Sequence, residues 1–155
     1  MIGIDVVDVE RFRATLERSP GLPGRLFTDD ERAYCLAGAD PVVHMAGTLA
    51  AKEAVIKALS LGNLAAWARR VEVTRGASGA PSVKVTGRRE TVGISITHDG
   101  GYAAAVAFRD ISGEPVREAS EEPTREGRGG NGKLDRFLDR PSPFARVLYP
   151  GSDFP

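Results

Sequence analysis

The chain lacks the features of a disulfide-bonded or membrane-embedded protein. Its 155 residues include one cysteine, Cys35, so neither an intramolecular disulfide nor a cysteine zinc cluster can form. Acidic residues at Asp5 and Asp8 precede any stretch that could serve as the apolar core of a signal peptide. No apolar run approaches the length of a transmembrane helix. These absences predict a soluble, cytoplasmic protein with no membrane contact.

An excess of charge of one sign is also missing. Lys and Arg total 21 and Asp and Glu total 21, so no global field attracts nucleic acid. The nearest approach to a nucleic-acid motif is Trp67 with Arg69 and Arg70, which lacks a basic stripe with interleaved aromatic residues. We therefore expect no nucleic-acid partner.

Composition divides the chain near residue 110. The apolar fraction of 41% is enough for one hydrophobic core, and the recognisable elements lie within residues 1–109. Residues 110–155 contain the stretch EPVREASEEPTREGRGGNGK, which is almost without apolar side chains. We predict a folded domain over 1–109, followed over 110–155 by a low-complexity linker and a tail that is disordered or forms a short docking segment.

Strand and hairpin signals in residues 1–109 predict a small antiparallel sheet. Residues 2–7 alternate as in a half-buried strand, which places Asp5 opposite the face of Ile2 and Ile4. VEVT and SVKVT flank the turn-rich GASGAP, and GISIT and YAAAVAF flank HDGG. Each pair predicts a hairpin.

Helix signals complete an α+β pattern. Asp8 suits the N-cap of a helix through VERFRATLER, and Thr28 with Glu31 forms a capping box for a second helix. The longest helix is expected from about Val43 to Leu61. We therefore expect a small antiparallel sheet packed with one long helix and shorter helices.

Three charges on the long helix are not explained by its amphipathic pattern. Lys52 falls inside an apolar arc, where an ammonium is costly unless an anion meets it. Glu53 and Lys57 share a face as an i,i+4 pair, which alone is typical of a solvated surface. The arc consists of Met45, Leu49, Val55, Ile56 and Leu59.

Asp5 is the candidate partner for these charges. Asp5 and Glu53 together suit magnesium, which is often held by two carboxylates, water and phosphate oxygens. The equally open alternative is a structural ion pair between Asp5 and Lys52. His98 lies at a hairpin tip beside Asp99, but spacing assigns it no role, and His44 has no comparable neighbours.

Three segments together, GIDVVDVERF, LAAKEAVIKAL and ISITHDGGYAAAVA, resemble the holo-[acyl-carrier-protein] synthases, which are small 4'-phosphopantetheinyl transferases. The resemblance covers residues 1–109 and implies the fold of that family. It implies magnesium-dependent transfer of 4'-phosphopantetheine from coenzyme A to a serine of an acyl carrier protein, in fatty acid or polyketide biosynthesis. The expected by-product is adenosine 3',5'-bisphosphate. It also implies a homotrimer with active sites between protomers, one contributing the Asp5 side and its neighbour the long-helix side.

The resemblance implies roles for individual residues. Asp5 and Glu53 would bind magnesium, and Glu53, Lys57 and His98 would be catalytic. Arg11 and Arg25 would contact the acidic carrier protein. The serine proton would pass to a metal-bound water, to Glu53, or to His98 assisted by Asp99, with the first two favoured. The residues expected to contact coenzyme A are Lys52, Lys57, Ser78, Gly79, Pro81, His98 and Asp99.

One departure from the family lies beside the long-helix motif. The family usually has Arg-Phe before the AAKEA run, whereas this chain has Thr48 and Leu49, so a cation expected in the coenzyme A site is missing. The other expected site residues are retained, which favours a working transferase: Asp5, Lys52, Glu53, Lys57 and His98. The alternative is a non-catalytic or repurposed relative that binds a carrier protein or coenzyme A.

Overall fold

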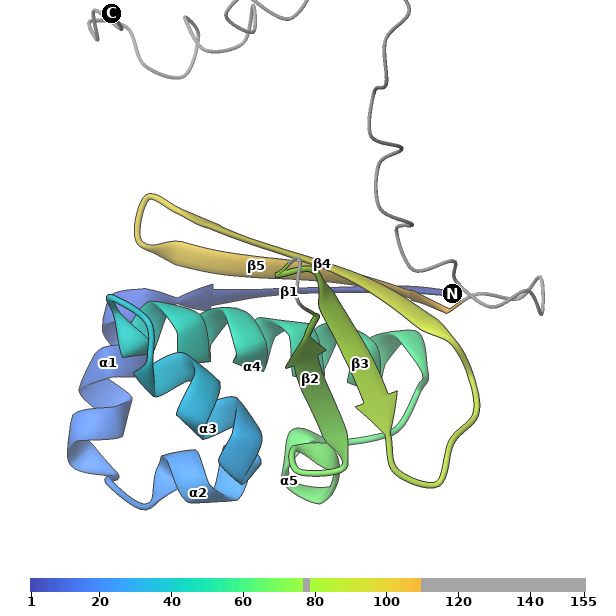
Figure 1. Ribbon diagram of the computed structural model, residues 1–155, viewed down its shortest axis with the longest axis horizontal. Helices are drawn as coiled ribbons and strands as arrows, with labels where there is room; N and C mark the ends of the chain where they lie inside the picture. Colours follow the sequence, from blue (N-terminus) through green and yellow to red (C-terminus); the bar gives the residue numbers. More distant parts are fainter. Residues whose placement is uncertain (77–78, 110–155) are drawn as a thin grey trace, which may run out of the picture. The chain divides into compact units, whose positions relative to one another are not determined.

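Two antiparallel sheets and one long helix organise the protein (Figure 1). The computed structural model describes residues 1–76 and 79–109, so the predictions for Ser78 and for residues 110–155 lie outside the described residues. The elements are β1 (Ile2–Asp8), α1 (Val9–Arg18), α2 (Leu22–Leu26), α3 (Asp29–Leu36), α4 (Pro41–Ala58), α5 (Leu64–Trp67), β2 (Val71–Arg75), β3 (Pro81–Val85), β4 (Val92–Asp99) and β5 (Tyr102–Arg109). One sheet has the strand order β1-β5-β4 and the other pairs β2 with β3. The predicted α+β class is therefore confirmed.

The local signals fold as predicted. The Asp8 carboxylate accepts a hydrogen bond from the Arg11 backbone N–H at 2.9 Å, and the capping box of Thr28 and Glu31 forms in both directions. Both hairpins form, because β2 pairs with β3 and β4 with β5. No helix in the described part of the chain is long and apolar enough to cross a membrane.

The long helix α4 differs from the prediction at both ends. It begins at Pro41 because Asp40 caps it, accepting hydrogen bonds from the backbone N–H groups of Val42 and Val43. It ends at Ala58 because Ser60 adopts a positive φ of 54°, and Gly62 follows with a φ of 101°.

Close contact between β1 and α4 decides which face of the strand is buried. A Cβ atom at position 3 would collide with the carbonyl oxygen of Ala54, so Gly3 lets strand and helix approach. Asp5 lies on this helix-facing side. The outward face carries Ile2, Ile4 and Val6, of which 67%, 62% and 58% is exposed. The alternation in the sequence indicated two faces but not that the isoleucines would lie outward.

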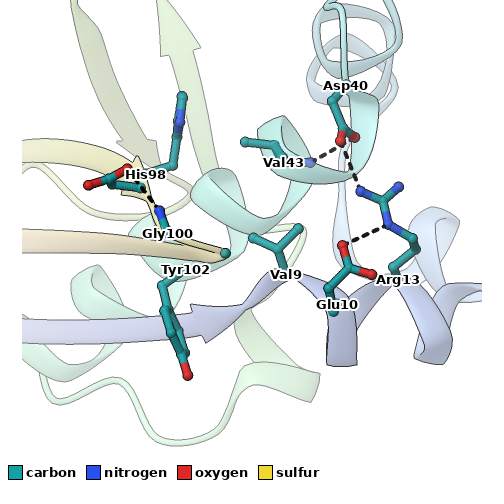
Figure 2. A pocket seen from close by; sticks show the side chains of 10 residues that line it. Val9, Glu10, Arg13, Asp40, Val43, His98, Gly100 and Tyr102 are labelled. Carbon is teal, nitrogen blue, oxygen red and sulfur yellow. Dashed lines mark hydrogen bonds and ion pairs between the residues drawn. The ribbon is translucent and has the colours of Figure 1, made fainter. Parts of the chain in front are cut away.

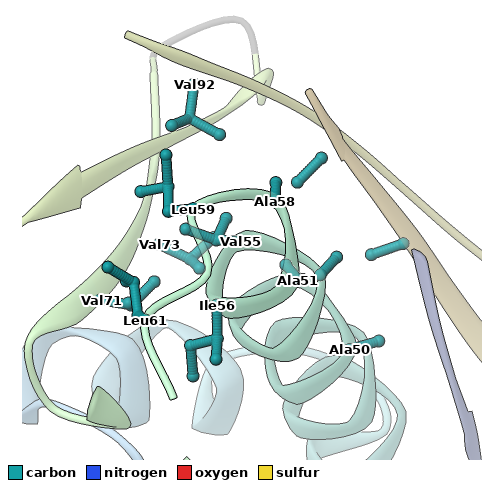
Figure 3. Packing of buried hydrophobic residues seen from close by; sticks show 13 residues of the cluster. Ala50, Ala51, Val55, Ile56, Ala58, Leu59, Leu61, Val71, Val73 and Val92 are labelled. Carbon is teal, nitrogen blue, oxygen red and sulfur yellow. The ribbon is translucent and has the colours of Figure 1, made fainter. Parts of the chain in front are cut away.

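Small residues on α4 bring the helix close to the sheet, and larger ones fill the other side (Figure 3). Ala51 and Ala54 are fully buried, and Val55 and Ile56 belong to the same cluster as Val71 of β2. Each large apolar side chain buried in this way stabilises the fold by roughly 1.5–3 kcal/mol. The core thus fixes α4 between the two sheets, so polar side chains at its edges have defined positions.

Candidate active site

Glu53 and Lys57 project from α4 near β1. The Lys57 ammonium lies 2.7 Å from Oδ1 of Asp5, and it donates a second hydrogen bond to the Ile4 carbonyl oxygen at 2.9 Å. The Asp5 side chain is 19% exposed and that of Lys57 is 51% exposed. The structure therefore brings Asp5 of the strand to the charged edge of the helix, where solvent can reach both groups.

A cleft of about 560 Å³ opens beside this ion pair, between β1, α1 and α4. Asp5 and Glu53 both line it, as do Arg11 of α1 and Leu49 of α4. Arg11 forms no ion pair within the described part of the chain. One cleft thus combines three acidic residues, Asp5, Asp8 and Glu53, with the guanidinium of Arg11.

The carboxylate of Asp5 influences that of Glu53. Burial raises the pKa of Glu53, the negative charge of Asp5 raises it further, and the Lys57 ammonium opposes both effects. A cation between Asp5 and Glu53 would relieve this repulsion, and carboxylate oxygens are ligands that magnesium prefers. Within residues 1–76 and 79–109 there is no cluster of three or more His, Cys, Asp or Glu side chains arranged to hold a metal ion. The donor set therefore fits an ion that takes its other ligands from water and substrate.

The expectation that Asp5 comes from one protomer and the long helix from its neighbour is wrong. Asp5 and Lys57 form their ion pair within one chain, and Asp5 and Glu53 line the same cleft. The close approach of β1 to α4 at Gly3 is the cause, because it places both elements side by side within one chain.

Lys52 does not face this cleft, so its predicted contact with coenzyme A is wrong. Its side chain is fully buried, and its ammonium lies 2.7 Å from Oε2 of Glu31. It also donates hydrogen bonds to the backbone carbonyl oxygens of Ala68 and Val71. The expected anion therefore exists, but it is Glu31 and not Asp5 or a phosphate.

His98 lies in a second, smaller cleft of about 270 Å³ (Figure 2). The ion pair of Arg13 and Asp40, 2.9 Å apart, forms part of its wall. Asp99 also lines this cleft, and its Oδ1 accepts a hydrogen bond from the Gly100 N–H at 2.8 Å. Tyr102 lines both clefts, which makes them neighbours.

The sequence predicted no notable neighbours for His44, but two aromatic rings lie beside it in the structure. Its imidazole lies 6.4 Å from that of His98 and 5.8 Å from the ring of Tyr34, measured between ring centroids. Spacing in the sequence could have indicated that His44 lies on a packed side of α4, because His44, Thr48 and Lys52 recur every four residues along one side of that helix.

The remaining predicted residues are more distant from these clefts. Gly79 adopts a φ of 80° in the turn before β3, which starts at Pro81. Gly79 and Pro81 line neither of the two clefts. Arg25 is exposed in the last turn of α2 and lines neither cleft. Thr48 is buried, and its hydroxyl donates to the His44 carbonyl oxygen at 2.9 Å. Thr48 therefore offers no group to a ligand.

Comparison with known proteins gives a consistent result. The family model for the 4'-phosphopantetheinyl transferase superfamily matches residues 1–107. The chain is 38% identical over 120 residues to the holo-[acyl-carrier-protein] synthase of Moorella thermoacetica, covering 71% of this chain and 93% of that protein. It is 40% identical over 118 residues to the synthase of Frankia casuarinae, covering 70% and 95%.

A solved structure agrees with the sequence relatives. The fold superimposes on Helicobacter pylori holo-[acyl-carrier-protein] synthase in complex with coenzyme A with a TM-score of 0.62 and 26% identity. The match covers 71% of this chain and 100% of that one. The chain belongs to the 4'-phosphopantetheinyl transferase superfamily and is an enzyme of the holo-[acyl-carrier-protein] synthase family.

Proposed function

We propose that this enzyme transfers 4'-phosphopantetheine from coenzyme A to a serine of an acyl carrier protein and releases adenosine 3',5'-bisphosphate. The observation that carries the proposal is the cleft in which Asp5, Glu53 and Arg11 lie together, with Lys57 bound to Asp5. The Helicobacter pylori relative was solved with coenzyme A, which supports coenzyme A as the donor.

Asp5 and Glu53 are the proposed magnesium ligands. Both carboxylates line the cleft. The pKa of Glu53 is raised mainly by burial and further by the negative charge of Asp5. When bound, the ion would neutralise charge on the diphosphate of coenzyme A. Lys57 lies beside Asp5 at the rim of the cleft, where its ammonium would bind the same diphosphate.

The chemistry is a phosphoryl transfer. A new bond forms between the serine oxygen and the β-phosphorus of coenzyme A, and the bond from that phosphorus to the bridging oxygen breaks. The bridging oxygen leaves with adenosine 3',5'-bisphosphate, and Lys57 stabilises the charge that builds on this leaving group. Glu53 is the proposed acceptor of the serine proton, because its carboxylate lines the cleft that the serine would enter.

We propose that the rest of coenzyme A extends into the adjoining cleft. His98 and Asp99 line it, and it meets the first cleft at Tyr102. His98 supplies a second polar group to the phosphates, so that the ligand would extend from Lys57 toward the β4–β5 hairpin.

Arg11 is the proposed contact for the carrier protein. Its guanidinium stands at the cleft and is without an ion pair in the described part of the chain, so it can meet an acidic surface beside the incoming serine. Arg25 would add a weaker contact from α2. Carriers of fatty acid and polyketide synthesis both fit this chemistry, and a cytoplasmic location would give access to both substrates.

We further propose that the enzyme is a homotrimer. The outward face of β1 exposes Ile2, Ile4 and Val6 by more than half, and β1 is an edge strand of its sheet. An apolar face of this kind on an edge is typical of an interface between subunits. Because the cleft of Asp5 opens along the same strand, a neighbour packed there would help to enclose coenzyme A.

Intact-mass spectrometry of an apo acyl carrier protein tests the proposed reaction. The carrier is incubated with coenzyme A, magnesium and the enzyme, and we expect it to gain the mass of one 4'-phosphopantetheine group. Glu53→Gln should slow the gain by about 10²- to 10⁴-fold while the protein stays folded. If no carrier of either pathway is modified, the proposal fails and the protein is a non-catalytic relative. If Glu53→Gln works at the normal rate, the role of Glu53 is wrong.

A further inference from the structure

Two pairs of adjacent arginines meet where α5 lies beside the start of β2 and the end of β3 (Figure 1). Arg69 and Arg70 follow α5, and Arg88 and Arg89 follow β3. The Thr86 backbone N–H donates a hydrogen bond to the Arg70 carbonyl oxygen at 2.8 Å, which joins the two connections. All four arginines are exposed. They form one basic surface, called the arginine surface below.

Trp67 holds two of these guanidiniums in place. Its indole is partly buried and packs against the hydrophobic core. The guanidinium carbon of Arg70 lies 5.5 Å from the centroid of this ring, and that of Arg88 lies 6.0 Å from it. Both distances are within the range of a cation–π contact. The two charges therefore have defined positions beside one anchored ring.

Carboxylates balance only part of this charge within the described part of the chain. Arg88 pairs with Glu90 at 3.1 Å. Arg69 lies 3.8 Å from Asp29. Arg70 forms no ion pair with a carboxylate of the described residues. Because Arg70 and Arg88 approach the same ring, their charges repel each other, and a bound anion would relieve this repulsion.

An acidic peptide fits the arginine surface better than a nucleic acid does. A guanidinium binds a carboxylate through two parallel hydrogen bonds, and two guanidiniums at fixed positions can bind two acidic side chains of one segment. A single strand of nucleic acid needs aromatic faces on which its bases stack. The ring of Trp67 already contacts the core and two guanidiniums, so it offers little surface to a base.

We propose that Arg70 and Arg88 bind an acidic segment of a partner protein, with Arg69 and Arg89 adding charge at the edges of the surface. None of the four arginines lines either cleft, so this partner and the reacting substrates can be bound together. The proposal therefore does not depend on the proposed function. A purely structural role, in which the arginines only tie α5 to the connection before β4, would affect stability but not the binding of acidic peptides.

The fluorescence of Trp67 reports on the arginine surface directly, because Trp67 is the only tryptophan in the chain. The full-length protein is titrated with a peptide of about ten glutamates that contains no aromatic residue. We expect a saturable change in emission that weakens as salt is added. Arg70→Gln should weaken the affinity roughly ten-fold, and Arg70→Lys, which keeps the charge, should lose less.

The matched control is Arg11→Gln, because Arg11 is also exposed and without an ion pair in the described part of the chain but lies at the larger cleft. This variant should retain the parental affinity for the peptide. The inference is overturned if the parent shows no saturable response, if Arg70→Gln binds as tightly as the parent, or if Arg11→Gln weakens binding equally. Equal or tighter binding of a single-stranded oligothymidylate would also overturn it. Failure of carrier modification by the parent would instead overturn the proposed function alone.

Discussion

The two lysines of α4 that lie five residues apart illustrate how differently one helix can use the same side chain. Lys52 is fully buried, with Glu31 and two backbone carbonyl oxygens around its ammonium. Lys57 is half exposed and bound to Asp5 at the rim of a cleft. The difference lies in the partners and in access to solvent. We infer that one side of α4 serves folding and the other serves the reaction.

The largest effect on stability is expected from Lys52→Met. This variant leaves the carboxylate of Glu31 buried without its cation, which should lower the free energy of unfolding by roughly 3–5 kcal/mol. Urea unfolding measures the loss. Adding Glu31→Gln removes the uncompensated charge, so the double variant should recover part of the lost free energy of unfolding. A loss below about 1 kcal/mol in Lys52→Met would show that the buried ion pair does not stabilise α4 against α3.

Lys57→Met should reduce activity and leave stability almost unchanged, the opposite of Lys52→Met. Loss of the ammonium proposed to bind phosphate should reduce kcat/KM for coenzyme A by roughly 10- to 100-fold, whereas an exposed ion pair contributes at most about 1 kcal/mol to stability. Steady-state kinetics and urea unfolding on the same preparation give both values. Lys84→Met is the control, because Lys84 is exposed on β3 and lines neither cleft. If the Lys57 variant lost stability but not activity, the two sides of the helix would have been assigned the wrong way round.

Gly3→Ala tests the contact that brings Asp5 to α4. A methyl group there would collide with the Ala54 carbonyl oxygen, so we expect a loss of about 1–3 kcal/mol in the free energy of unfolding and weaker activity. Gly24→Ala is the control, because nothing lies within 4 Å of a Cβ at that helical position. Equal stability of the two variants would contradict the close packing of β1 on α4.

The smallest effect concerns the pH dependence of Glu53. Its pKa is raised above the ordinary 4.5 by burial first and by Asp5 second, so the folded protein binds that proton more tightly than the unfolded chain. Its contribution to stability therefore falls as pH rises above 4.5 and stays low near neutral pH. Glu53→Gln should melt at a higher temperature than the parent near neutral pH, with the difference closing below pH 4.5.

Glu90→Gln provides a control of opposite sign. A hydrogen bond from its own backbone N–H, together with Arg88, lowers the pKa of Glu90, so its negative charge stabilises the fold. This variant should melt below the parent near neutral pH. Melting differences of the same sign for both variants would contradict the electrostatic description of the cleft.

Local patterns in the sequence predicted much of the fold. The caps at Asp8 and Thr28 form as expected, and so do both hairpins, because these features depend on residues close in sequence. Lys52 correctly indicated a buried anion. Its partner was missed because Glu31 had been assigned to the capping box, yet its two oxygens also serve Lys52 and the Val73 backbone N–H.

The site required contacts that no local pattern contains. The closeness of Asp5 to α4 depends on Gly3, which looks in the sequence like one more small residue in a strand. The neighbourhood of His44 likewise depends on elements that are distant in the chain, since α3 and β4 supply Tyr34 and His98. Sequence reasoning therefore grouped Asp5, Glu53 and Lys57, which the structure brings together, but it could not separate Lys52 from Lys57.

The most direct test of the division of α4 is a time course of carrier modification, followed by intact mass, with Lys52→Met and Lys57→Met side by side. The folded fraction of each variant is measured first, and rates are compared per folded molecule. We predict the parental rate for Lys52→Met and a rate roughly ten-fold or more lower for Lys57→Met. A parental rate for Lys57→Met, or an equal loss in both variants, would contradict the account.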